Sequence, residues 1–169
     1  MVPSHRLIDP PWHDEVAAAL DAASHGVAAF YAIRPREWAS RFRYDLASAV
    51  DHPELEFRPG TLAQIVQLEI AGSPHPPRWR IVLRDRVIVR LARRHGLHTV
   101  LSYTLAHELV HLVRFASGLA PFDLGEEHSR SAEEARVRRV AFDALLPVLG
   151  ADAREALLAL AAPLEDVPG

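Results

Sequence analysis

The residues best suited to chemistry lie between Tyr103 and Phe115, where the centre of the run reads His-Glu-x-x-His. His107 and His111 are four residues apart, so on an α-helix they lie one turn apart on the same face. Two imidazoles in that arrangement can bind one zinc ion, and Glu108 beside them can act as a general base. Leucines and valines between these residues supply an apolar stripe, so the run predicts a buried helix that carries a metal site.

Two histidines do not complete a catalytic zinc site, which usually takes three protein ligands and leaves one position for water. The chain has no cysteine, so the third ligand must offer nitrogen or oxygen. A His-x-x-Gly-x-x-His continuation is absent, because Arg114 and Ser117 occupy the positions of its glycine and last histidine. The candidates that remain are His128 in the following loop, and Glu133 and Glu134 on a helix that would pack antiparallel to the first.

The pattern resembles the gluzincin clan of zinc metallopeptidases, the thermolysin-like group. In that clan a liganding glutamate on the next helix follows His-Glu-x-x-His at a comparable distance. The resemblance rests on residues 103–115 and 133–140, under a fifth of the chain. The same stretch, with Phe122 between its parts, also looks like small bacterial proteins regarded as metallopeptidases of unknown substrate.

The resemblance implies a zinc-dependent hydrolase, most simply a peptidase acting on a peptide or protein substrate. Zn²⁺ would be bound by His107, His111 and one of the two glutamates, of which Glu134 is favoured and Glu133 is the alternative. Glu108 would take a proton from water and pass it to the leaving amine.

Two supporting parts of such a site are left open by the sequence. In the thermolysin pattern an aspartate four residues after the liganding glutamate orients a ligand histidine, whereas Arg138 stands there (or Val137, if Glu133 is the ligand). Neither side chain can accept the histidine N–H, so support must come from elsewhere. The candidates for stabilising a tetrahedral oxyanion are Tyr103, Tyr44, Tyr31, His98 and Arg114.

Length and composition place these residues in one small domain. The chain has 169 residues, 49% of them hydrophobic, with a net charge of −3, which predicts a single domain over 1–169 with a real core. No apolar run approaches a membrane span and no signal peptide is recognisable at the start, so we expect a cytoplasmic protein without a membrane partner. The expected fold class is α+β, a small zincin-like domain whose short antiparallel sheet packs on the motif helix and the following ligand helix.

Hydrophobic spacing predicts the elements that position the site. Helices are expected over 12–31, 35–50, 97–115, from 129 or 131 to 147 or 150, and over 152–161. A strand is expected over 61–70, and the runs 81–83 and 87–89 are expected to form a tight β-hairpin or two successive strands. In zincins the substrate commonly adds as a strand along a sheet edge, and Val87–Val89 is the edge expected here.

All 19 basic residues are arginine, and seven of them lie between Arg78 and Arg94 with Trp79 among them. Such a basic hairpin could face nucleic acid. The arginines can also be the solvent-exposed face of an antiparallel sheet. This interpretation is favoured, because the net charge of the chain is slightly negative. The alternatives to a peptidase are therefore a catalytically idle zinc-binding module and a nucleic-acid-associated module that uses the arginine-rich 78–94 segment.

Overall fold

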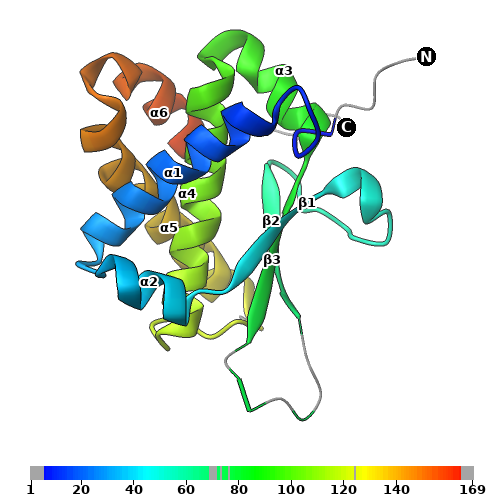
Figure 1. Cartoon of the computed structure of the whole chain (residues 1–169), viewed down its shortest axis with the longest axis vertical. Helices are drawn as coiled ribbons and strands as arrows, with labels where there is room; N and C mark the ends of the chain where they lie inside the picture. Colours follow the sequence, from blue (N-terminus) through cyan, green and yellow to red (C-terminus); the bar gives the residue numbers. More distant parts are fainter. Residues whose placement is uncertain (1–5, 69–71, 73, 76, 124, 165–169) are drawn as a thin grey trace.

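The computed structural model describes residues 6–68, 72, 74–75, 77–123 and 125–164, and it has an α+β architecture (Figure 1). The helices are α1 His13–Phe30, α2 Pro35–Arg41, α3 Asp85–His95, α4 Leu97–Ala116, α5 Glu127–Leu149 and α6 Arg154–Ala161. The strands are β1 Tyr44–Ser48, β2 Ala63–Leu68 and β3 Arg78–Leu83, and short 3-10 turns cover Ala49–Asp51 and Ala151–Ala153. Among these described helices, none is by itself both long and apolar enough to cross a membrane.

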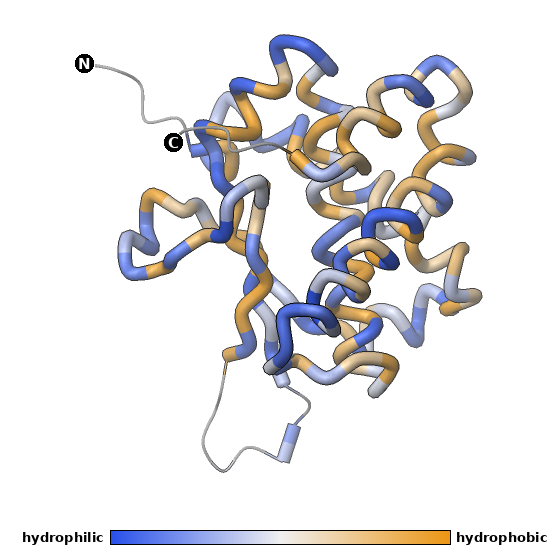
Figure 2. The backbone as a smooth tube through the Cα atoms, turned by 180° about the vertical axis from the view of Figure 1, so that it is seen from behind, coloured by the Kyte–Doolittle hydropathy of each residue, from blue (hydrophilic) through white to orange (hydrophobic). Residues whose placement is uncertain are grey.

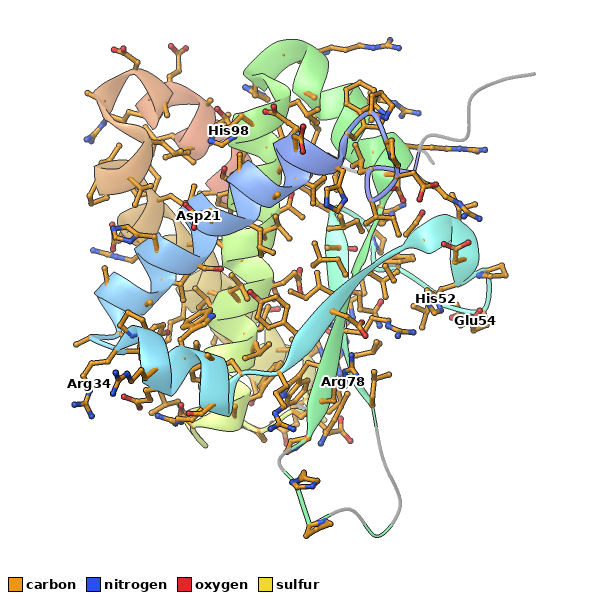
Figure 3. All side chains as sticks on the ribbon, in the orientation of Figure 1. Asp21, Arg34, His52, Glu54, Arg78 and His98 are labelled. Atoms are coloured by element: carbon orange, nitrogen blue, oxygen red, sulfur yellow. The ribbon has the colours of Figure 1, made fainter. Side chains whose placement is uncertain are left out.

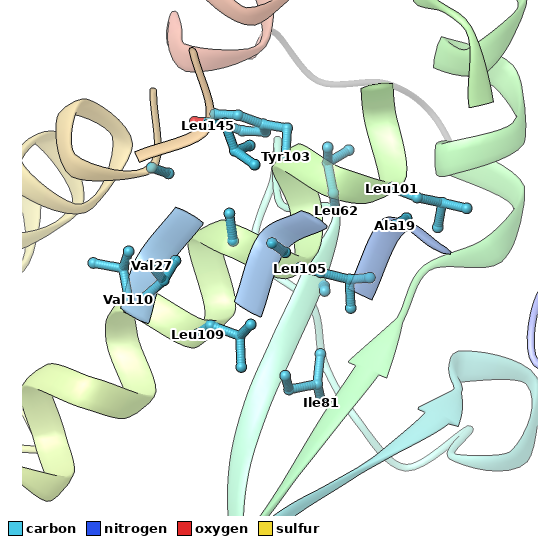
Figure 4. Close-up of a cluster of buried hydrophobic side chains, with 14 of the residues drawn as sticks. Ala19, Val27, Leu62, Ile81, Leu101, Tyr103, Leu105, Leu109, Val110 and Leu145 are labelled. Atoms are coloured by element: carbon cyan, nitrogen blue, oxygen red, sulfur yellow. The ribbon is translucent and has the colours of Figure 1, made fainter. Parts of the chain in front are cut away.

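Helix α4 is the centre of the fold. It contacts α1, α3, α5 and α6 as well as β2 and β3, so nearly all of its surface is covered (Figure 1). Its leucines Leu101, Leu105 and Leu109 lie in the core beside Ala19 and Val27 of α1 (Figure 4). A helix that is apolar on most sides must be buried on most sides, which is the arrangement seen. The predicted helices over 12–31 and 97–115 are therefore confirmed.

The sheet is mixed, in the order β1-β3-β2, with β1 parallel to β3 and β2 antiparallel to it. The strand predicted over 61–70 is confirmed over 63–68 as β2, and residues 69 and 70 lie outside the described residues; the expected short antiparallel sheet was wrong. The difference is due to β1. The helix predicted over 35–50 ends at Arg41 as α2, and residues 44–48 form β1, which pairs with β3. All five residues of β1 pair with β3, and Asp45 also accepts a hydrogen bond from Arg80 of β3 (Nε to Oδ1, 2.6 Å), so long-range pairing stabilises the extended conformation.

The predicted hairpin was also wrong, because Val87–Val89 lies in α3 and only 81–83 is a strand. The carboxylate of Asp85, in the first turn of α3, is buried and accepts hydrogen bonds from the Leu7 backbone N–H (2.7 Å) and the Ser48 hydroxyl (2.6 Å). An acid in the first turn favours a helix start. Residues 85–95 then place valines and isoleucine inward and arginines outward, a helical alternation of hydropathy that is visible along the backbone in Figure 2.

Helix α5 covers the region where the ligand helix was expected, but it begins at Glu127, before either predicted cap serine. It continues through Pro147 and ends at Leu149, before Gly150, whose positive φ of 84° suits a glycine. The last helix, α6, starts two residues later than predicted because a 3-10 turn precedes it.

Candidate metal centre

The carboxylate of Glu134 lies between the two histidines of the motif. Its Oε2 is 3.3 Å from His107 Nε2, and its Oε1 is 3.1 Å from His111 Nε2. The histidines share one face of α4, and Glu134 projects from α5, which packs against that face. Within the part of the chain that the structure describes, this is the one group of three such side chains close enough to hold a metal ion, with ligand atoms within 4.8 Å of one another.

These distances suit a shared metal ion. Zinc binds nitrogen and carboxylate oxygen at about 2.0–2.1 Å in tetrahedral geometry, so two of its ligand atoms stand about 3.3 Å apart. Burial by itself raises the pKa of Glu134, but hydrogen bonds from His107 and His111 outweigh it and hold the pKa well below its ordinary value. The carboxylate is therefore ionised at neutral pH, and two imidazoles with one carboxylate form a donor set typical of zinc hydrolases.

Glu133, the alternative ligand, points elsewhere and is paired with Arg114 of α4. Both oxygens are engaged: one accepts from Arg114 Nε, the other from Arg114 Nη2 at 2.9 Å. His128, the loop candidate, lies exposed in the first turn of α5 and is outside the group. Glu133, paired with Arg114, and the buried Val137 lie four residues apart on one face of α5, and with that face turned inward Glu134 faces the histidines.

Glu108 is buried beside the two histidines and lines the same cleft. Burial raises the pKa of Glu108 to about 7. The charge of Glu134 adds to this increase, whereas the charge of His107 and a hydrogen bond from the Ile65 backbone oppose it. A carboxyl group that titrates near neutral pH can both accept and release a proton under physiological conditions.

The cleft over this site has a volume of about 600 Å³ and is bounded by α4, α5, β2 and the segment after α6. Sequence reasoning did not foresee that β2 and Arg138 would line it. No local signal shows that a strand lies at a sheet edge beside a given helix. Arg138 could have been found, because it is four residues after Glu134 and so shares its helix face.

Of the five candidates for oxyanion stabilisation, only Tyr103 lines the cleft. Tyr44 lies with its hydroxyl 3.3 Å from Ser24 Oγ, and His98 sits near the surface beside Glu15 (Figure 3). Arg114 is held by its ion pair, and the half-buried Tyr31 lies beside it. The Tyr103 hydroxyl is buried and has no hydrogen-bond partner among the described residues.

Among the described residues, no side chain or carbonyl orients the ring of His111 through its Nδ1 atom. His111 Nδ1 is buried and meets no hydrogen-bond partner in the described ranges of the chain. Metal-binding histidines usually donate this second N–H to a carboxylate or carbonyl, which fixes the ring and raises its basicity. The absence agrees with the sequence, in which Arg138 replaces the orienting aspartate.

The arginine-rich segment is not the hairpin that a nucleic-acid surface was expected to use, because it is divided between β3 and α3. Several of its arginines make structural contacts. Arg78 and Arg80 pair with Asp45 at 3.5 and 2.6 Å, and Arg84 Nη1 donates to the Thr61 carbonyl at 2.8 Å (Figure 3 labels Arg78 at the end of the sheet).

Comparisons of the chain with protein-family models, with curated proteins and with solved structures found no match. The comparisons therefore add nothing to the resemblance to gluzincins, which rests on the sequence motif and its spacing.

Proposed function

We propose that the protein is a zinc-dependent hydrolase, most simply a peptidase. The observation that carries the proposal is the carboxylate of Glu134, which faces Nε2 of both His107 and His111 at distances suited to a common ion. Glu108 is buried next to this group and opens onto a cleft large enough for a peptide segment.

The three side chains would hold the ion, and Glu108 would move the proton. When bound, zinc would supply Lewis-acid chemistry by lowering the pKa of a water molecule and polarising a carbonyl. Glu108 would accept a proton from the attacking water and return it to the leaving amine. Tyr103 is the hydroxyl donor that lines the cleft.

Strand β2 replaces Val87–Val89 as the edge for a substrate strand. It is the last strand on its side of the sheet, and the Leu62 carbonyl accepts a hydrogen bond from Arg84 N–H at 2.9 Å. Because hydrogen-bonded and non-hydrogen-bonded pairs alternate in an antiparallel ladder, the backbone groups of alternate β2 residues point to the open edge. Those residues are Ala63, Ile65 and Gln67. The Ile65 N–H already donates to Glu108, so an extended peptide would pair through Ala63, Gln67 and the Ile65 carbonyl.

The test is the metal content of the native chain and of Glu108→Gln by native mass spectrometry, combined with hydrolysis of a peptide library. We expect about one zinc per chain in both proteins, and hydrolysis lowered by about 10²- to 10⁴-fold in Glu108→Gln. Glu134→Ala should lose the zinc, whereas Asp143→Ala, on the outer face of α5, should keep it. Zinc bound equally well by Glu134→Ala would overturn the ligand assignment.

The unpartnered His111 Nδ1 favours a second candidate, a zinc site without catalytic activity. Such a site would bind zinc through the same side chains, and neither the native chain nor Glu108→Gln would hydrolyse any member of the library. Stoichiometric zinc without turnover would therefore select this candidate over the peptidase.

A further inference from the structure

One end of the cleft is closed. Gly60, in the loop before β2, lies so near the segment after α6 that a β-carbon added to it would stand 2.5 Å from the Leu164 carbonyl oxygen. Residues of both segments line the cleft, together with Tyr103 and Leu160. A peptide lying in the cleft therefore meets a wall at this end.

Two hydrogen-bond donors without partners stand at that closed end. Tyr103 is 3% exposed, and its hydroxyl has no partner in the described part of the chain. Arg138 lines the cleft one turn after Glu134, and none of the ion pairs among the described residues includes it. The Arg138 charge acts on the Tyr103 hydroxyl, so the two groups are close.

Two anionic groups also act on the Tyr103 hydroxyl: Glu108, and Glu134, which faces the two histidines. Glu56 and Arg58, which also line the cleft, are both exposed and of opposite sign. Burial raises the pKa of Tyr103, so its hydroxyl keeps its proton and remains a donor. A phenol and a guanidinium that both lack partners suit an anionic oxygen, and a charge-assisted hydrogen bond is the strong kind.

The direction of β2 indicates which end of a peptide would reach this wall. The backbone of Ile65 lies at Glu108, and Gln67 pairs with Trp79, whose ring stacks on Phe115 at 6.1 Å. Strand β2 thus runs along α4 from the Tyr103 end toward Phe115. A peptide paired antiparallel to β2, the more stable pairing, would point its C-terminus at the closed end.

We propose that Tyr103 and Arg138 bind the free C-terminal carboxylate of the substrate, so that the substrates are peptides cut close to their C-terminus. This inference rests on the proposed hydrolase function. The Arg138 charge favours the same orientation, because a peptide entering in the opposite direction would bring its ammonium group against the Arg138 guanidinium.

The experiment compares N-acetylated tetraalanine with its C-terminal amide by isothermal titration calorimetry on zinc-loaded Glu108→Gln, which binds without turnover. We expect the free acid to bind about 10- to 100-fold more tightly than the amide. Arg138→Gln in the same background should bring that ratio close to one, and Tyr103→Phe should lower it several-fold. Arg139→Gln is the matched control, because this neighbouring side chain is 85% exposed and should leave the ratio unchanged.

Equal affinity for acid and amide in the zinc-loaded protein would overturn the inference while leaving the proposed function intact. A second result would also overturn it: the wild-type protein cleaves the acid and the amide equally fast, and Tyr103→Phe slows both reactions. The two donors would then stabilise the oxyanion and not the terminal carboxylate. If no zinc binds, the proposed function fails. The same titration on the metal-free protein then still decides whether Arg138 selects a carboxylate.

Discussion

The buried ion pair between Arg114 of α4 and Glu133 of α5 offers a direct test of how the site is held. Their side chains are 8% and 7% exposed, so each charge depends on the other. Replacing Glu133 alone with leucine leaves a buried guanidinium with only neutral partners, the Leu119 carbonyl and Tyr31, and no counter-charge. We expect Glu133→Leu to lower the free energy of unfolding by about 3–5 kcal/mol. Arg136, the other cation near Glu133, is 62% exposed and is free to turn into solvent.

The double variant Arg114→Met/Glu133→Leu should behave differently, because it removes both charges together with the penalty of burying them. We expect its stability to lie within about 1 kcal/mol of the wild type, or above it. With a urea slope of about 2 kcal/mol/M, the single variant should shift the midpoint downward by about 2 M, and the double variant by about 0.5 M or less. Equilibrium urea unfolding of the metal-free proteins, followed by circular dichroism, measures these midpoints.

Two results would refute this reasoning. If Glu133→Leu shifts the midpoint no further than Arg139→Leu on the exposed face of α5, the pair contributes nothing. If the folded double variant no longer binds zinc while Glu134→Ala does, then Glu133 and not Glu134 is the third ligand.

Two further changes test the burial of the site and the packing of the helices around it. Burial raises the pKa of Glu108 to about 7 from an ordinary value of 4.5, so the folded metal-free protein loses stability as pH rises between these values. Glu108→Gln escapes this loss and should be about 3 kcal/mol more stable than wild type at pH 8 and equal to it at pH 4; a difference independent of pH would contradict the assignment. A β-carbon at Gly26 of α1 would stand 2.6 Å from the Ala144 carbonyl oxygen of α5, so Gly26→Ala should lower the thermal midpoint by a clash that exceeds the roughly 1 kcal/mol gained in helix propensity. Gly125→Ala, with no atom within 4 Å of its added carbon, is the control, and equal midpoints for the two variants would show that the helices can separate without penalty.

Local sequence was enough to foresee the core of the candidate site. The pairing of His107 and His111 on one face depends only on helical geometry, and the apolar residues between them require that helix to be buried. The same kind of local periodicity identified α1 and β2, whose patterns involve no distant partner. The interval from the motif to Glu133 and Glu134 showed that a second helix could reach the histidines.

Tertiary structure decided what local patterns left ambiguous. Residues 44–48 have helical spacing yet form β1, because β3 supplies a parallel partner and Arg80 a counter-charge. The run after Leu83 has β-branched residues yet forms α3, because the buried Asp85 receives donors from residues 37 and 78 positions away. The choice between the adjacent Glu133 and Glu134 depends on the rotation of α5, which is set by contacts with α4. Neighbouring residues determine the hydrophobic periodicity of a segment. The face that the segment turns toward its partner is selected only when distant elements pack together.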